Sequence, residues 1–171
     1  MGANWCCRAT RNPRLEPSCV AVFKDELLQL FPGNERAQRL ARQSVTLAQV
    51  LAKRGWKPPP GPAAKAVLHG HCHQKPLEGT QADVVLLKAA GLDAQAPDPG
   101  CCGMADAYGF KPEHFATSQR IGEVALLPAV RAAAADTLIV ADGSSCREQI
   151  EQGTGRGTLH LAEALARTVR N

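Results

Sequence analysis

The sequence has few aromatic residues and no long apolar run. Aromatic residues make up 4% of its 171 residues, so alanine, valine and leucine must form most of a core. A membrane-spanning helix needs roughly 20 consecutive apolar residues, and the best candidate, 124–140, is interrupted by Pro128, Arg131 and Asp136. The N-terminus also lacks the apolar segment of a secretory signal peptide. We therefore expect no membrane span and a cytoplasmic location, either free or peripheral at the inner face of the membrane.

Long runs of one charge sign are absent too. The chain has 20 Lys and Arg residues against 16 Asp and Glu residues, and its basic residues are spread along the sequence. Nucleic-acid-binding domains concentrate positive charge on one face, so we expect no nucleic-acid partner. The segment GTGRG at 153–157 is a weak candidate for nucleotide binding, because it lacks the Gly-Lys-Ser/Thr ending of a phosphate-binding loop and follows a predicted helix.

Short cysteine spacings are missing, although cysteine itself is abundant. The chain has seven cysteines, an odd number that fits poorly with a closed set of disulfides. In a reducing compartment, cysteines are more often ligands or redox groups. The sequence contains neither the CxxC pairs of a zinc ribbon nor the CxxCxxC run of a ferredoxin-type cluster. Any site formed by these cysteines must therefore be assembled by the fold.

A proline-rich connector at 58–62 separates two patterns in the chain. Before it, the apolar spacing predicts one helix from Phe23 to Phe31 and a second helix that Asn34 caps and Gly55 ends. The N-terminal half is therefore expected to be helical.

After the connector, short apolar strands alternate with helices. The predicted strands cover 66–70, 92–96 and 137–140, and the final helix is expected to begin before Leu159. This order, with connections long enough for helical crossovers, is typical of a parallel sheet. We expect an α/β fold with a small three-stranded parallel sheet flanked by helices, half of a doubly wound domain, and a preceding helical segment.

A loop that carries cysteine follows each predicted strand directly. Cys72 comes after the first strand, Cys101 and Cys102 after the second, and Cys146 after the third. Because ligands bind beyond the carboxyl ends of parallel strands, we expect these four residues to converge on one metal site. Four thiolates suffice for a cubane 4Fe-4S cluster or for a zinc ion. A cluster with several irons suits adjacent cysteines better, so it is the first hypothesis and zinc is the alternative.

Neighbouring residues are expected to support the site. Adjacent strand residues point to opposite faces, so both members of the cysteine pair can reach one site only if the chain turns, which Gly100 and Gly103 permit. Positive groups and helix N-termini stabilise thiolates. The residues predicted to hydrogen-bond the sulfur ligands or to balance their charge are His71, His73, Lys75, Gly103 and Arg147.

The histidines have competing interpretations. His71 and His73 either belong to this shell or are ordinary residues of an exposed loop. His69, in the predicted strand, is interpreted as a core histidine with hydrogen-bond partners of its own. A nucleophilic pair of Cys72 with His71 or His73 is a further alternative, but it leaves the double cysteine and Cys146 unexplained.

Four segments resemble a known family, the cysteine-rich CCG domain. They are HCHQK at 71–75, GCCGMADAYGF at 100–110, DGSSCREQI at 142–150 and GTGRGTLHLAEALA at 153–166. This domain occurs in heterodisulfide reductase and in the iron–sulfur subunits of glycolate oxidase and anaerobic glycerol-3-phosphate dehydrogenase. It also forms the C-terminal part of FAD-linked oxidases of the D-lactate and D-2-hydroxyglutarate dehydrogenase type. The stretch 100–166 is most similar to these fused oxidases.

The resemblance implies a division of the chain. Family members carry two such modules in tandem, and LEPSC at 15–19 is similar to the motif that closes the first module. The implied parts are a disordered or non-native start at 1–14, the end of a first module with two helices at 15–57, and the second module at 63–171. Cys19, from the first closing motif, is a further candidate ligand of the metal.

The chain departs from the family pattern at two positions. Many members close the second module with Cys-x-x-Cys, but Gly143 stands at the first of these places, three residues before Cys146. Glu16 stands at the equivalent place before Cys19. The five-cysteine set of a non-cubane 4Fe-4S cluster is therefore incomplete in the second module.

The resemblance implies an oxidoreductase with an electron-transfer role. The expected cofactor is an iron–sulfur cluster, 4Fe-4S, and FAD would belong to a missing domain or to a partner. The expected partners are a flavin-containing dehydrogenase domain or subunit that oxidises a 2-hydroxy acid, and an electron acceptor such as a quinone or a carrier protein. Alone, the chain is not expected to be catalytic. The alternative is a zinc-binding or metal-free structural or interaction domain, including a truncated, non-functional fragment.

Overall fold

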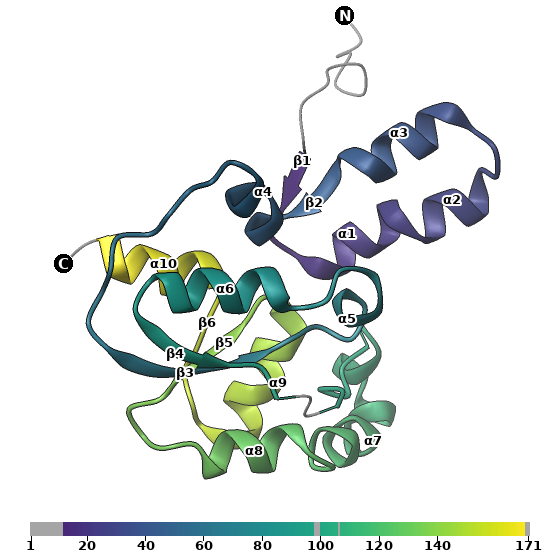
Figure 1. The fold of residues 1–171 in the computed structure, drawn as a ribbon. Helices are drawn as coiled ribbons and strands as arrows, with labels where there is room; N and C mark the ends of the chain where they lie inside the picture. Colours follow the sequence, from purple (N-terminus) through teal and green to yellow (C-terminus); the bar gives the residue numbers. More distant parts are fainter. Residues whose placement is uncertain (1–11, 98–99, 106, 170–171) are drawn as a thin grey trace, which may run out of the picture.

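The computed structural model describes residues 12–97, 100–105 and 107–169. Within them, a four-stranded parallel sheet carries helices on both faces, and a smaller helical segment precedes it, which confirms the predicted α/β class (Figure 1). The strand order is β4-β3-β5-β6. The strands are β3 (Ala64–His69), β4 (Leu92–Gln95), β5 (Leu138–Ala141) and β6 (Thr158–Leu159).

The two central strands, β3 and β5, define the edge at which a site can form. Their register runs from Ala66 opposite Leu138 to His69 opposite Ala141, so both strands end at the same level. The chain leaves β3 for β4 on one side and then crosses back to β5 on the other. Where the strand order reverses in this way, the connections leave in opposite directions and open a crevice beyond the carboxyl ends of the strands.

Two layers of helices cover the sheet (Figure 1). One layer consists of α6 (Gln81–Ala89) and α10 (Leu161–Val169), with α4 (Leu47–Lys53) packed on the outer side of α6. The other consists of α8 (Leu126–Ala132) and α9 (Ser144–Thr154), with α7 (Pro112–Gly122) beside α9. Because side chains alternate along a strand, Leu68 and Val140 pack beneath the first layer, whereas Ile139 packs beneath the second. Burying each large aliphatic side chain contributes about 1.5–3 kcal/mol, so these two cores fix both faces of the sheet.

The sheet has one strand more than predicted. β6 has only two residues, Thr158 and Leu159, which pair with Ile139 and Val140 of β5. Leu159, expected in the last helix, therefore lies in a strand, and α10 begins at Leu161. Two residues are too few to show an alternating pattern, so only the neighbouring strand reveals this pairing.

The N-terminal segment contains a second, two-stranded parallel sheet. Its elements are β1 (Asn12–Arg14), α1 (Pro17–Lys24), α2 (Glu26–Leu30), α3 (Glu35–Gln43) and β2 (Ser44–Thr46). The helix predicted from Asn34 to Gly55 is wrong in its middle, because β2 pairs with β1 and separates α3 from α4. Asn34 caps α3 as predicted, and Thr46 forms a capping box with Gln49 that starts α4.

The predicted first helix is also divided. It consists of α1 and α2, which meet at Asp25 instead of forming one helix up to Phe31. β1 lies inside the start at 1–14, for which no regular structure was expected. Cys6 and Cys7 lie outside the described residues.

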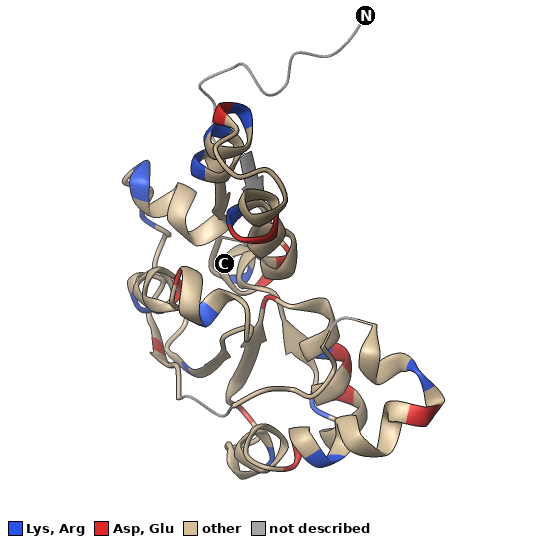
Figure 2. Ribbon diagram, turned by 90° about the vertical axis from the view of Figure 1, so that its right-hand side faces the viewer, with Lys and Arg blue, Asp and Glu red and all other residues tan. Residues whose placement is uncertain are grey.

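Two short elements occupy the loops that follow β3 and β4. They are α5 (Gln74–Leu77) and the 3₁₀ helix η2 (Tyr108–Phe110). An ion pair between Lys24 and Glu78 ties α1 to the end of α5. Figure 2 shows Lys and Arg interspersed with Asp and Glu over the described helices. None of these helices is long and apolar enough to cross a bilayer.

Candidate metal centre

Four cysteines come together at the carboxyl edge of the sheet. Cys72 follows β3, Cys101 and Cys102 lie in the loop after β4, and Cys146 is in the first turn of α9, directly after β5. The Sγ atoms of Cys102 and Cys146 are 3.3 Å apart. Side-chain hydrogen bonds also link Cys72 with Cys101 and Cys101 with Cys102. Three loops that are distant in sequence therefore contribute to one continuous group of sulfur atoms.

The group extends from the interior to the surface. Cys102 and Cys146 are 2% and 1% exposed, whereas Cys72 and Cys101 are half-buried. A centre held by these residues would be shielded from water on one side. Its other side would remain close enough to the surface for electron exchange with a partner.

Hydrogen bonds among the four thiols lower the pKa of two of them and raise the pKa of the other two. Hydrogen bonds from Cys102 and Cys72 lower the pKa of Cys101, and the Gly103 N–H, 3.3 Å from its Sγ, adds to this effect. The hydrogen bond with Cys102 lowers the pKa of Cys146 to about 5, against the effect of burial. The pKa values of Cys72 and Cys102 are raised, first by the hydrogen bond with Cys101. The lowered pKa values of Cys101 and Cys146 favour the thiolate, the form that binds metals.

The turn at the cysteine pair is fixed by a close approach of the backbone. Gly100 and Gly103 have φ of +73° and +88°, a region that favours glycine. A Cβ atom at Gly103 would lie 2.2 Å from the carbonyl oxygen of Ser118 in α7. The Gln149 side chain of α9 donates hydrogen bonds to the carbonyl oxygens of Cys102, at 2.9 Å, and Ser118, at 3.1 Å. Gln149 therefore holds the turn between two helices, a role that nothing in the sequence pattern indicated.

His69 belongs to the site, although it was interpreted as a core histidine with its own hydrogen bonds. It is the last residue of β3 and is 2% exposed. Neither ring nitrogen has a hydrogen-bond partner at normal geometry among the described residues, and the ring instead interacts with Cys146, whose pKa it lowers, so that interpretation is wrong. One ligand atom each from His69, Cys102 and Cys146 lie within 4.8 Å of one another. Its place at the end of a strand, three residues before Cys72, was the only available signal.

The two loop histidines occupy different environments. His71 is buried, and its Nδ1 accepts a hydrogen bond from the N–H of His73 at 3.2 Å. The electrostatic interaction with His71 also lowers the pKa of Cys146, after the contributions of Cys102 and His69. The side chain of His73 is exposed and stands edge-on to the His71 ring. Of the two, His71 therefore has the closer relation to the sulfur atoms.

The two cations predicted beside the cysteines contact backbone oxygens. Lys75 donates a hydrogen bond to the carbonyl oxygen of Gly100 at 2.9 Å, which joins the loop after β3 to the loop after β4. Arg147 donates to the carbonyl oxygens of Ala141, at 3.0 Å, and Asp142, at 2.8 Å, and so closes the turn between β5 and α9. Both side chains hold the loops that carry the thiols, and they place positive charge near them.

Cys19 lies apart from this hydrogen-bonded group. It is in the first helical turns of α1, and its side chain is exposed. The hydrogen bonds that connect the other four thiols do not include it. A ligand role for Cys19 therefore stays a prediction.

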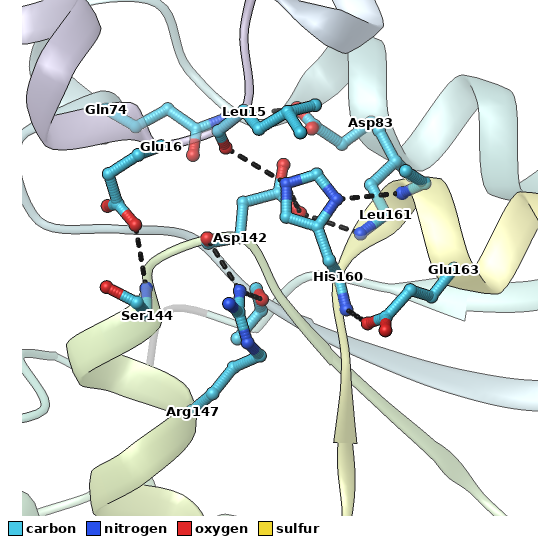
Figure 3. Close-up of polar contacts among 12 residues, drawn as sticks. Leu15, Glu16, Gln74, Asp83, Asp142, Ser144, Arg147, His160, Leu161 and Glu163 are labelled. Carbon is cyan, nitrogen blue, oxygen red and sulfur yellow. Dashed lines mark hydrogen bonds and ion pairs between the residues drawn. The ribbon is translucent and has the colours of Figure 1, made fainter.

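A polar junction holds the residues before α1 against the same edge of the sheet (Figure 3). The Glu16 carboxylate accepts a hydrogen bond from the Ser144 N–H, at 2.9 Å, where α9 begins. Nδ1 of His160 accepts a hydrogen bond from the N–H of Ala162, so its Nε2 donates to the carbonyl oxygen of Leu15 at 2.9 Å. The N-terminal segment is thus joined to the turn that carries Cys146.

Two buried carboxyl groups lie beneath this junction (Figure 3). Asp142 accepts a hydrogen bond from the Leu161 N–H and lies 3.6 Å from Nε2 of His160. Asp83 accepts one from Gln74, while its Oδ1 has no partner in the part of the chain that is described. Burial raises the pKa of both carboxyl groups, that of Asp83 to about 7.

The glycine-rich segment at 153–157 has a structural role. Its Arg156 donates hydrogen bonds to the carbonyl oxygens of Ala133, Ala134 and Thr137, at 3.0, 3.1 and 2.7 Å. These contacts fix the loop before β5. The guanidinium group is therefore engaged with the backbone, which argues against a phosphate-binding role for this segment.

Comparisons with known proteins point to dehydrogenases. No family model matches the chain, and no solved structure matches it significantly. One subunit of the anaerobic glycerol-3-phosphate dehydrogenase from Escherichia coli K12 is 39% identical over 107 residues, which are 60% of this chain and 26% of the relative. D-2-hydroxyglutarate dehydrogenase from E. coli K12 is 27% identical over 159 residues, which are 91% of this chain and 15% of the relative. The same enzyme from Pantoea ananatis is 26% identical over 153 residues, 88% of this chain and 15% of the relative.

The chain spans about a quarter or less of the length of these relatives. The similar proteins are dehydrogenases or dehydrogenase subunits, and the described residues contain a Cys/His cluster that could hold a metal. Thiolate and imidazole are soft or borderline donors, which select zinc or the irons of iron–sulfur clusters over calcium or magnesium. The donor set therefore fits the predicted cofactor and its zinc alternative.

Proposed function

We propose that this chain is the iron–sulfur electron-transfer module of a flavin-linked 2-hydroxyacid oxidoreductase. The observation that carries the proposal is the meeting of Cys72, Cys101, Cys102 and Cys146 at the switch point of the sheet. Chance placement of buried cysteines would not bring four thiols from three separate loops to one edge. The resemblance to the CCG domain and the similarity to dehydrogenases support the same function.

The number and arrangement of donors favour a cluster over a single ion. A tetrahedral zinc ion takes four ligands, whereas four thiols and the ring of His69 lie together here. Cys101 and Cys102 are adjacent in sequence, and a cluster with several metal atoms offers each of them a separate attachment point. We therefore propose a 4Fe-4S cluster bound by the four cysteines, with Cys19 as a further candidate ligand.

The residues of the chain would bind the cluster and set its environment. A bound cluster supplies reversible one-electron transfer. Burial of Cys102 and Cys146 excludes water from one side, and the Gly103 N–H already donates a hydrogen bond to Cys101. Hydrogen bonds to sulfur and burial are two of the factors that set the potential of such a cluster. Lys75 and Arg147 contribute positive charge around the site.

The proposal also includes partners that supply the flavin, the substrate site and the electron acceptor. The proposal assigns the flavin and the substrate site to another domain or subunit, which oxidises a 2-hydroxy acid and passes electrons to this chain. The electrons would then go to a quinone or a carrier protein. We propose that the chain is not catalytic by itself, and that it acts in the cytoplasm or peripherally at the inner face of the membrane. In this scheme, 15–57 is the end of a first module and 63–171 is the second.

Metal analysis of the anaerobically purified full chain tests the proposal. The protein should be brown and contain about four iron atoms and four sulfides per chain, with an EPR signal after reduction. Cys102→Ser and Cys146→Ser should each lose most of the iron. Asp93→Asn, at an exposed position in β4, is the control and should keep it.

A different metal content would contradict the proposal. Colourless protein that holds one zinc ion per chain would instead support the structural alternative. Iron that survives both cysteine substitutions would place the cluster elsewhere and remove the argument made from this edge of the sheet.

A further inference from the structure

We propose that His69 is a direct ligand of the metal centre, through one of its ring nitrogens, beside Cys102 and Cys146. This inference rests on the proposed function and deepens it, because the ligands proposed above are all sulfur atoms. A cubane cluster takes one protein ligand at each of its four irons, so His69 would bind in place of one of the four thiolates. A neutral imidazole there makes the cluster less negative, which raises its reduction potential. The identity of this ligand therefore bears on the direction of electron transfer.

The sheet directs His69 toward the sulfur atoms. His69 is the last residue of β3 and pairs with Ala141, the last residue of β5, at the switch point. Its neighbour Leu68 packs in the core beneath α6 and α10. Because alternate residues face opposite sides of a sheet, His69 faces the other core, to which Cys102 and Cys146 belong.

The ring of His69 is buried, and neither Nδ1 nor Nε2 forms a hydrogen bond of normal geometry among the described residues. Its residue is 2% exposed, and the ring interacts with Cys146 and lowers the pKa of that thiol. The two other buried histidines differ: Nδ1 of His71 accepts from the His73 N–H, and Nε2 of His160 donates to the Leu15 carbonyl oxygen. A buried polar atom without a hydrogen bond is unfavourable. A bond from nitrogen to metal would offset this cost at one of the two atoms.

The distances between the donor atoms of His69, Cys102 and Cys146 are short enough for all three to reach one metal centre. One ligand atom from each of His69, Cys102 and Cys146 lies within 4.8 Å of the other two. Zinc binds thiolate at about 2.3 Å and imidazole at about 2.0–2.1 Å, so neighbouring ligands of a tetrahedral site are roughly 3.5–4 Å apart. In the zinc alternative, small side-chain movements would bring the three atoms to three corners of such a site. Cys101, hydrogen-bonded to Cys102, is the nearest candidate for the fourth corner.

Pulsed EPR of the wild-type full chain tests the inference without any substitution. The chain is prepared anaerobically with its iron–sulfur cluster, once with ordinary histidine and once with ¹⁵N-labelled histidine. The reduced cluster should show the hyperfine coupling of a directly bound nitrogen, and the coupling should change with the label. A full iron–sulfur signal without histidine coupling would overturn the His69 ligand and leave the proposed electron-transfer function standing.

Substitutions identify which histidine is responsible. His69→Ala should abolish the coupling and lower the iron content at least twofold, while His69→Cys should restore the iron content without nitrogen coupling. His114→Ala, on α7 and outside the sulfur group, should leave both measurements unchanged. Nitrogen coupling that persists in His69→Ala would contradict the assignment. Circular dichroism checks that each variant is folded, and the wild-type measurement decides the question if one is not.

The zinc content of the wild-type chain and the ligands of that zinc distinguish failure of the His69 inference from failure of the proposed electron-transfer function. If the wild-type chain binds zinc and no iron, the electron-transfer proposal fails. X-ray absorption at the zinc edge then decides the ligand: one nitrogen and three sulfur atoms would uphold His69, and four sulfur atoms would overturn it. A chain that retains neither metal would overturn both proposals.

Discussion

The ring of His71 occupies the space that a side chain at Gly143 would need. A Cβ atom built on Gly143 would lie 2.5 Å from Cδ2 of His71 and 3.1 Å from Sγ of Cys146. The resemblance to the CCG domain places a cysteine at this position in many members. In this chain, a buried imidazole fills the place, so a fifth thiol there would require His71 to move.

Gly143→Ala should therefore disturb the metal site. The backbone at Gly143, with φ −70° and ψ 125°, suits alanine, so any effect comes from the contact with His71 and Cys146. We expect a loss of about 1–3 kcal/mol in the free energy of unfolding and at least a twofold loss of bound iron. Urea unfolding and metal analysis measure these two effects. Gly157→Ala, where a Cβ atom would meet nothing within 4 Å, is the matched control. Equal stability and iron content in the two variants would show that His71 gives way freely.

The two glycines beside the cysteine pair allow backbone strain to be separated from steric overlap. Both have positive φ, but only a Cβ atom at Gly103 would meet the Ser118 carbonyl oxygen, at 2.2 Å, whereas one at Gly100 would meet nothing within 4 Å. Gly100→Ala should cost about 1–2 kcal/mol, the strain of left-handed backbone. Gly103→Ala should cost clearly more, about 3 kcal/mol or above, and should lose the metal. Thermal or urea unfolding of the two variants provides the comparison, and equal losses would argue against the close approach of the turn to α7.

The contribution of Asp83 to the stability of the chain should fall as the pH rises through neutrality. Burial, and then the charge of Asp142, raises the pKa of Asp83 from 3.8 to about 7. Between these values the folded chain binds more protons than the unfolded chain, so this contribution is fully present below about pH 4 and lost above about pH 7. We expect a change on the order of 3 kcal/mol across this range. Urea unfolding at several pH values measures it.

Asp83→Asn should flatten this pH dependence, because an amide does not ionise. Asp93→Asn, at an exposed position, is the matched control. The assignment to Asp83 would be wrong if the decline between about pH 4 and pH 7 persisted in Asp83→Asn and disappeared in Asp93→Asn.

The contact between Glu16 and Ser144 should contribute to the junction of the N-terminal segment with α9. The carboxylate accepts a hydrogen bond from an N–H at the start of the helix, where negative charge is favourable. Glu16→Ala should lower the free energy of unfolding by about 1 kcal/mol. Glu16→Gln retains an acceptor oxygen and should lose only part of this. Chemical unfolding distinguishes the two variants, and an identical loss in both would mean that the hydrogen bond itself contributes little.

The order of strands and cysteines was sufficient to predict the most important feature of the site. Each cysteine-bearing loop directly follows a predicted strand, and parallel strands end at a common edge. This rule depends on chain order alone, so it placed Cys72, the cysteine pair and Cys146 together without knowledge of any distance. It also placed His71, Lys75 and Arg147 nearby, because they are neighbours of the cysteines in sequence.

Features that depend on contacts between distant segments could not be predicted in this way. β2 interrupts a sequence with good helical spacing because β1 offers it a pairing partner, and β6 is too short to have a pattern. Gln149 reaches the cysteine turn from α9. His69 looked like a core residue, because lack of a hydrogen-bond partner is a property of its surroundings and leaves no trace in local sequence.

The sequence by itself determined the class of fold and the set of candidate sulfur donors, since alternation of strands and helices and the positions of cysteine are local properties of the chain. Only the tertiary structure decided how these donors interact. It set which thiols are buried, which have raised and which have lowered pKa values, and that the ring of His69 faces Cys102 and Cys146. The physical reason is that burial and hydrogen bonding depend on every segment packed around a group, and most of these segments are remote in sequence.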